Sequence, residues 1–164
     1  MRVIVKPNGA VKTSFPYNSV YPHLGSHFQT QRMQEAMSYS QRKAIETLCQ
    51  DLGLPRYDRF TQDWEYELAE EFRTVAWLKK YIGAYQNQAY GEQERQVLMK
   101  LLLDSLNDGI ESGDSAFELL WNDVALLLSR DRELHKQLIE HWSLGTEPLE
   151  DAFAITPRIR ELRL

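Results

Sequence analysis

Apolar residues recur every three or four positions along most of the chain after residue 30, and this spacing predicts amphipathic helices. The pattern separates into five stretches, which cover approximately residues 30–52, 61–82, 92–107, 114–128 and 131–144. The connections between them are short, so neighbouring helices are expected to pack antiparallel as a bundle.

Local signals mark several of the helix ends. Gly53 can adopt the left-handed conformation that ends a helix, and Pro55 prevents the helix from continuing. Thr61 is the expected N-cap of the second helix, and either Asp114 or Ser115 is expected to cap the fourth.

The last part of the chain carries signals of its own. Gly145 is expected to stop the fifth helix. Thr146 and Thr156 each precede a short segment with helix-start chemistry, and Pro157 suits the first helical position. Residues 146–164 are therefore predicted to form a short helical tail.

The N-terminal segment has a different pattern. Val3 and Val5 alternate with their neighbours, and Asn8-Gly9 is a strong two-residue turn signal, so residues 1–15 are predicted to form a small β-hairpin. Residues 16–29 hold Pro22 and Gly25 and show no helical period, which predicts an extended aromatic loop.

Together these elements predict a mainly α protein. It is a bundle of about five helices over residues 30–145, with a small N-terminal β-hairpin and a short helical C-terminal tail. The length of 164 residues is typical of one domain, so residues 1–164 are expected to fold as a single unit.

Charge and composition exclude some classes of function. The net charge is −5, but the first 60 residues carry eight Lys and Arg against four Asp and Glu, whereas the remainder carries eleven against twenty. Such an acidic majority argues against nucleic-acid binding, which needs clustered basic residues. The longest apolar run is five residues, at 124–128, and no signal-peptide core follows the N-terminus, so we expect a cytoplasmic protein without a membrane segment.

The sequence offers few groups for catalysis. His23 and His27 are four residues apart but lie in the predicted loop, where the helical geometry that aims two rings at one metal ion is lost. His135 and His141 point to different faces of the fifth helix and are interpreted as a surface and an edge histidine. Cys49, the single cysteine, falls on the apolar face of the first helix.

No phosphate-binding loop or nucleophile elbow is present. We therefore expect no metal, no cofactor and no catalytic residue.

Two acidic windows and one aromatic stripe remain as candidates for binding. Residues 61–71 and 104–123 contain five and six acids respectively and no Lys or Arg. In the segment 77–85, three aromatic residues are spaced by four, and they lie either in the centre of the bundle or on an interface. The candidate binding residues are Glu67, Glu71, Asp108, Asp114, Trp77, Tyr81 and Tyr85.

Three functions are compatible with these features. The leading hypothesis is a small acidic binding protein that sequesters or inhibits a basic protein partner, as immunity proteins and antitoxins do. The first alternative is a ligand-binding or hydrolytic enzyme, with His23, His27 and Glu67 or Glu71 where the loop 16–28 meets the helices. The second is a homodimeric structural or adaptor protein that pairs through the stripe from Trp77 to Tyr85.

Overall fold

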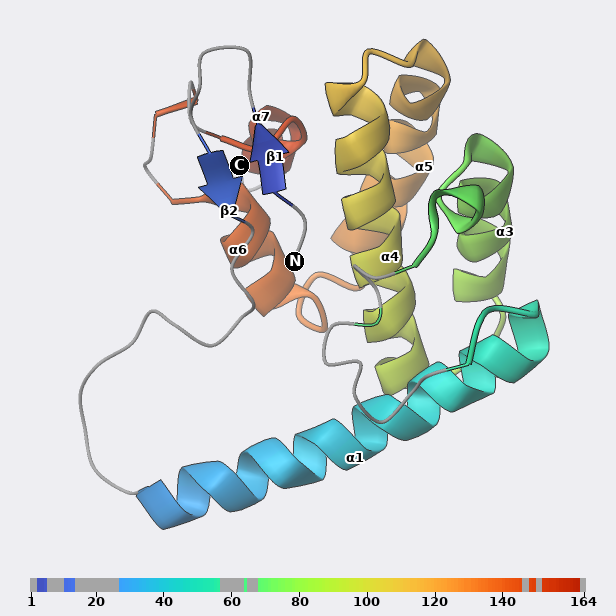
Figure 1. The fold of residues 1–164 in the computed structure, drawn as a ribbon, viewed down its shortest axis with the longest axis vertical. Coiled ribbons are helices and arrows are strands. Elements are labelled where there is room, and N and C mark those ends of the chain that lie inside the picture. The colour runs from blue at the N-terminus through green and yellow to red at the C-terminus, as the bar shows by residue number, and fades with distance from the viewer. Residues whose placement is uncertain are drawn as a thin grey trace. The chain divides into compact units, whose positions relative to one another are not determined.

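The structure is a computed structural model that describes residues 3–5, 11–13, 27–56, 64, 68–145, 148–149 and 152–162, with side chains from residue 39 onward. The chain divides into two compact units, Met1–Gln34 and Glu35–Leu164, each considered by itself. The described part is mainly helical, as the spacing of apolar residues predicts (Figure 1). That residues 1–164 form a single domain stays a prediction.

The first unit contains two short strands and the beginning of a helix. Strands β1 (Val3–Val5) and β2 (Val11–Thr13) pair antiparallel, with Val3 opposite Thr13. The predicted turn at Asn8-Gly9 lies outside the described residues, so the hairpin as a whole stays a prediction. Most of the predicted aromatic loop also lies outside them.

Helix α1 (His27–Leu52) begins earlier than the predicted Thr30, so His27 and Phe28 are helical and the predicted extended loop is wrong at this end. Nothing after Gly25 restricts the backbone against helix formation, which explains the earlier start. The helix ends as predicted, because Gly53 has φ +71° and the amide of Leu54 bonds to the carbonyl of Cys49 at 3.1 Å.

The predicted second helix is not continuous, although Trp64 is helical. Leu68 and Ala69 are not helical, a single 3₁₀ turn η1 covers Glu70–Phe72, and helix α3 covers Val75–Tyr85. Thr74 caps α3, since its side-chain oxygen accepts a bond from the amide of Trp77 at 3.5 Å. The predicted cap Thr61 lies outside the described residues.

Helices α4 (Glu92–Glu111) and α5 (Ser115–Arg130) confirm the third and fourth predicted helices. Glu94 accepts a bond from the Gly91 amide at the start of α4. Asp114 is the cap of α5, because its carboxylate accepts a bond from the amide of Ala116 at 2.9 Å.

The last helices are α6 (Lys136–Ser143) and α7 (Thr156–Glu161). Helix α6 starts five residues later than the predicted Asp131, because residues 131–135 form turns. Thr156 is a buried residue of α7 rather than its cap, and its hydroxyl donates to the carbonyl of Trp142 at 2.8 Å. The predicted start at Thr146 lies outside the described residues.

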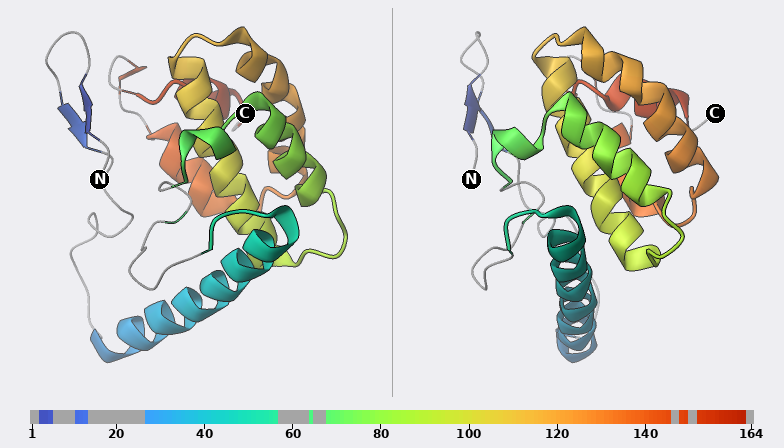
Figure 2. Two further views of the ribbon diagram at one scale, coloured as in Figure 1. Left: turned by 45° about the vertical axis from the view of Figure 1, so that its right-hand side comes forward. Right: turned by 90° about the vertical axis from the view of Figure 1, so that its right-hand side faces the viewer.

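Helix α4 occupies the centre of the second unit, and α3 and α5 pack along it (Figure 2). Every residue from Val97 to Asn107 except Lys100 is buried. The C-terminal half of α1 adds Ala44, Ile45, Leu48 and Cys49 to the same core. Among the described residues, no helix combines the length and the apolar composition that crossing a bilayer requires.

Candidate functional site

A largely buried ion cluster joins the turn before α3 to the C-terminal half of α4. The guanidinium of Arg73 bonds to the carboxylates of Asp104 and Asp108, the latter at 2.9 Å, and we call these three residues the Arg73 cluster. The two acids are one turn apart on α4, so they present their carboxylates to the same cation. Burial lowers the pKa of Arg73, but the two carboxylates more than reverse this effect and the pKa is raised.

Several exposed carboxylates surround this cluster. Glu70 and Glu71 are in η1, three and two residues before Arg73, and both are exposed. The amide of Asp114 bonds to the carbonyl of Gly109, which brings this exposed acid close to Asp108. We call the following residues the acidic surface: Glu70, Glu71, Asp108, Glu111 and Asp114.

Three of the four acidic residues predicted as binding residues lie on the acidic surface. Glu71, Asp108 and Asp114 belong to the acidic surface, whereas Glu67 lies outside the described residues. Asp108 is partly neutralised, because it shares the single positive charge of Arg73 with Asp104.

The aromatic stripe of α3 is mainly a part of the core. Tyr81 and Tyr85 are 0% and 1% exposed, so they do not form the interface that the dimer hypothesis requires. Trp77 is half-buried, and its ring packs between Phe72 and Tyr81 with centroid distances of 5.2 and 5.6 Å. Central burial, the other interpretation of this spacing, is therefore confirmed for the two tyrosines.

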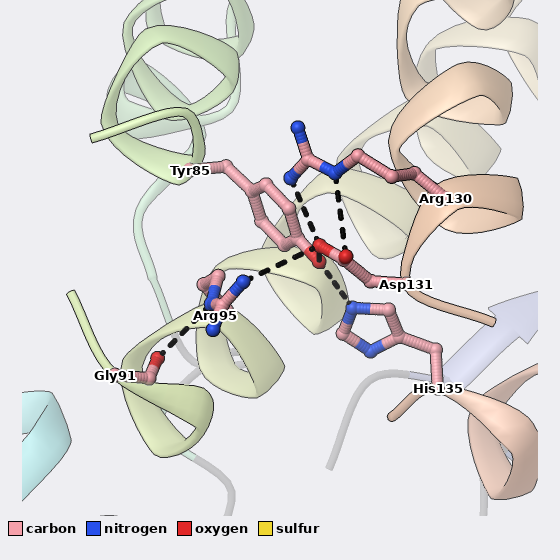
Figure 3. A network of polar contacts seen from close by, with 6 residues as sticks. All are labelled: Tyr85, Gly91, Arg95, Arg130, Asp131 and His135. Atoms are coloured by element: carbon pink, nitrogen blue, oxygen red, sulfur yellow. Dashed lines mark hydrogen bonds and ion pairs between the residues drawn. The ribbon is translucent and has the colours of Figure 1, made fainter. Parts of the chain in front are cut away.

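A second polar cluster joins α3 to the turn between α5 and α6 (Figure 3). The hydroxyl of Tyr85 lies 2.8 Å from Oδ2 of Asp131 and 2.5 Å from Nε2 of His135. Arg130 bonds to both oxygens of Asp131, and Arg95 approaches the same carboxylate at 3.6 Å. We call these five residues the Tyr85 network.

The geometry of the Tyr85 network indicates which atom carries each proton. Hydrogen bonds from Arg130 lower the pKa of Asp131, so the carboxylate is an acceptor. The phenol of Tyr85 has one proton, which it donates to Asp131, and His135 therefore donates from Nε2 to the phenol oxygen. Burial raises the pKa of Tyr85 and keeps the phenol protonated.

This arrangement fastens helices together rather than exposing a reactive group. Tyr85 is 1% and His135 2% exposed, which leaves a substrate no access to either ring. Next to the network lies a shallow hollow of about 230 Å³, lined in part by Asp131, Arg95 and Arg130. Among the described residues, no three His, Cys, Asp or Glu side chains gather closely enough to hold a metal ion.

The sequence analysis named Asp108 and Tyr85 as candidates, but it missed their partners Arg73 and His135. His135 was expected on the surface and is instead buried, because tertiary contacts with Tyr85 enclose it. His141 is half-buried beside Trp142, which agrees with its interpretation as an edge residue. A signal for the Arg73 cluster was present, because Asp104 interrupts the apolar run between Leu103 and Leu106.

The enzyme hypothesis concerns residues that the structure leaves mostly undescribed. His23 and Glu67 lie outside the described residues, and only the backbone of His27 is described. Glu71 is exposed in η1. A site where the loop 16–28 meets the helices stays a prediction.

Comparison of the chain with protein-family models, with curated proteins and with solved structures gives no match.

We predict that His135 makes the fold sensitive to mild acid. Burial lowers its pKa from 6.5 to about 4, so the unfolded chain takes up a proton before the folded chain does. Stability should therefore be complete above pH 6.5 and fall by about 3 kcal/mol as the pH decreases to about 4. Urea unfolding of wild type and His135→Gln, which keeps an N–H donor but does not titrate, measures this difference.

His141 also has a pKa lowered by burial and by Lys100, and it remains in both proteins. The comparison therefore isolates the contribution of His135. If the two proteins lose stability in parallel over this pH range, buried neutral His135 is not the cause.

Proposed function

We propose that this chain is a non-catalytic binding protein whose acidic surface holds a basic protein partner. The observation that carries the proposal is the Arg73 cluster, because it fixes two acidic segments far apart in sequence on one part of the fold. Arg73 lies directly after the exposed acids of η1, and its guanidinium is held by the α4 carboxylates.

The local charge balance supports this proposal. Residues 104–123 contain no Lys or Arg, so the exposed carboxylates of Glu111 and Asp114 have no basic neighbour in their own segment. Arg73 is buried and committed to Asp104 and Asp108, and therefore contributes little positive potential at the surface. A concentration of one sign of charge attracts an oppositely charged protein and accelerates its association.

The acidic residues Glu111 and Asp114 lie on backbone that is held in place, which also supports the proposal. Glu111 is in α4, and Asp114 is fixed both by its backbone bond to Gly109 and by capping α5. Charges on well-packed elements lose little conformational freedom when a partner binds. Small acidic proteins that neutralise a toxin or a nuclease are the nearest functional analogy, and the analogy rests on charge, size and helical class.

The test is a paired charge reversal. Glu71→Lys with Glu111→Lys changes two exposed members of the acidic surface and leaves the Arg73 cluster and the α5 cap intact. Glu46→Lys with Glu140→Lys changes the net charge equally at exposed positions on α1 and α6. Both variants should keep the helical circular dichroism of the wild type.

The partner is identified by carbodiimide cross-linking in the cells that produce the protein, then purified and titrated. At low salt, we expect the acidic-surface variant to associate about tenfold more slowly and the control variant at a nearly unchanged rate. The difference should decrease at high salt, because salt screens charges at the interface. Equal losses in both variants, or binding that is insensitive to salt, would contradict the proposal.

A further inference from the structure

Helices α6 and α7 form a pair that is distinct from the three helices α3, α4 and α5. The two members of the pair pack closely against each other, and α3, α4 and α5 pack closely among themselves. Among the described elements, no comparably close backbone packing links α6 or α7 to those three helices. The pair lies on one side of α4 and α3 lies on the other (Figure 1). The second unit therefore contains two groups of helices.

Hydrogen bonds join the end of α6 to α7. The last carbonyls of a helix have no partner within the helix itself. In α6, the carbonyl of Trp142 accepts instead from the hydroxyl of Thr156 at 2.8 Å. The carbonyl of Ser143 accepts from Nε of Arg160, also at 2.8 Å. Side chains of α7 thus cap the last turn of α6.

Neither helix is long enough to be stable by itself. Helix α6 has eight residues and α7 has six. Isolated helices shorter than about 12–15 residues are marginal in water, so each of these two depends on tertiary contacts. Because part of those contacts comes from the other helix, loss of one removes capping or packing from the other. The two helices are therefore expected to form and unfold together.

The polar attachment of the pair to α3 is located at its start. The Tyr85 network holds Asp131 and His135, and His135 directly precedes α6 (Figure 3). Further along, Arg158 of α7 bonds to Glu118 of α5 at 3.0 Å, but the side chain of Glu118 is 54% exposed and such ion pairs add little stability. The remaining attachment includes non-directional packing of apolar residues in the core: Leu138, Ile139, Trp142, Ile155 and Ile159.

Two features of the pair destabilise its closed arrangement. Nε1 of the buried Trp142 has no hydrogen-bond partner in the part of the chain that the structure describes, so burial of this donor is not compensated. Leu144, the C-cap of α6, has φ +49°, a left-handed conformation that costs a leucine free energy. Opening of the pair would return the indole to water and release the backbone of Leu144.

We propose that α6 and α7 open and close as one unit while α3, α4 and α5 stay folded, with the hinge directly after His135. The Tyr85 network fixes the turn before the hinge, so opening moves the two helices that follow it. The acidic surface lies on η1, on α4 and at the cap of α5, and none of its residues belongs to the pair. The open state keeps this surface, and the proposal is independent of the basic partner.

Native-state hydrogen exchange of the ¹⁵N-labelled full chain at neutral pH measures this opening. The amide of Ile139 donates to the carbonyl of His135 at 2.9 Å, and the amide of Ile159 donates to the carbonyl of Ile155 at 3.0 Å, so each amide reports on one helix. Both should show the same opening constant, at least about tenfold larger than that of the slowest amides of α4. Different constants for the two helices, or constants equal to those of α4, overturn the proposal.

A substitution in α6 tests whether the two helices are coupled. Glu140→Gly changes an exposed residue of α6 and lowers its helix propensity, so the opening constant measured at Ile139 should increase about fivefold. The constant at Ile159 in α7 should increase by the same factor. Asn122→Gly is the matched control at an exposed position of α5. It should accelerate the slowest amides of α4 and leave both helices of the pair unchanged, because α5 is folded in the closed and in the open state.

If Glu140→Gly accelerates Ile139 alone, the two helices open separately. If Asn122→Gly accelerates the pair as much as α4, the chain opens only as a whole. Either result overturns the proposal.

Thr156→Val tests the bond that joins the helices, because it removes the hydroxyl and keeps the shape of the side chain. The carbonyl of Trp142 loses its donor, and the opening constants of α6 and α7 should both increase about tenfold. Thr47→Val removes a hydroxyl bond to the carbonyl of Lys43 in α1 and should leave both constants unchanged. An effect of Thr156→Val that is confined to α7, or no effect, contradicts the coupling of the two helices.

Discussion

Replacement of Arg73 with methionine is expected to lower the free energy of unfolding by about 3–5 kcal/mol, because it leaves a carboxylate buried without its cation. The side chain of Asp104 is 12% exposed and that of Arg73 6%, so water cannot take over the interaction. The two acids would also repel each other across one turn of α4. Chemical unfolding at neutral pH measures the loss.

A second variant separates the loss of charge pairing from the loss of packing. Arg73→Met combined with Asp104→Leu removes the buried carboxylate together with the cation, and should recover a large part of the stability. Arg73→Lys should be intermediate, because an ammonium group keeps the charge but cannot reach both carboxylates as a planar fork. If Arg73→Met costs less than about 1 kcal/mol, the cluster is not the buried ion pair that its geometry indicates.

Gly109→Ala is expected to destabilise the protein by about 2–3 kcal/mol, although alanine is the better helix former. A Cβ at Gly109 would overlap the ring of Phe117, which lies directly on the glycine backbone. Phe117 is 8% exposed in the first turn of α5, so its ring cannot move into solvent without losing buried area. Thermal and chemical unfolding both measure this effect.

Gly83 provides the control, since it is an exposed glycine inside α3 whose added Cβ would meet nothing within 4 Å. Gly83→Ala should stabilise the protein by about 0.5–1 kcal/mol. Adding Phe117→Leu to Gly109→Ala should restore part of the loss, because the smaller side chain relieves the overlap. A Gly109→Ala protein as stable as Gly83→Ala would show that α4 and α5 separate easily at this point.

Helices α4 and α5 could be predicted well because their signals are local. Asp114 precedes the helix that it caps, and the apolar residues of both helices repeat at helical spacing. The second helix was predicted as continuous because Trp64, Leu68 and Phe72 keep the same spacing, but Leu68 and Ala69 are not helical and only α3 is the predicted helix. Apolar side chains can reach one core from a 3₁₀ turn as well as from a helix, so spacing alone does not distinguish the two.

The candidate sites were harder to predict because their partners are far apart in sequence. Arg73 meets Asp104 and Asp108 more than thirty residues later, and Tyr85 meets His135 fifty residues later. A helical wheel placed His135 by its own helix, but the residue precedes α6 and its position is determined by α3. The exposed acids were easier to recognise, because two base-free windows are visible in the sequence itself.

The central position of α4 has a consequence for folding during synthesis on the ribosome. The helices that cover it, α3 and α5, are its immediate neighbours along the chain, and the connections between them are only a few residues long. Closing such short loops costs little entropy, and native contacts between adjacent segments form early. A chain still attached to the ribosome can therefore enclose most of α4 as soon as residue 130 has emerged.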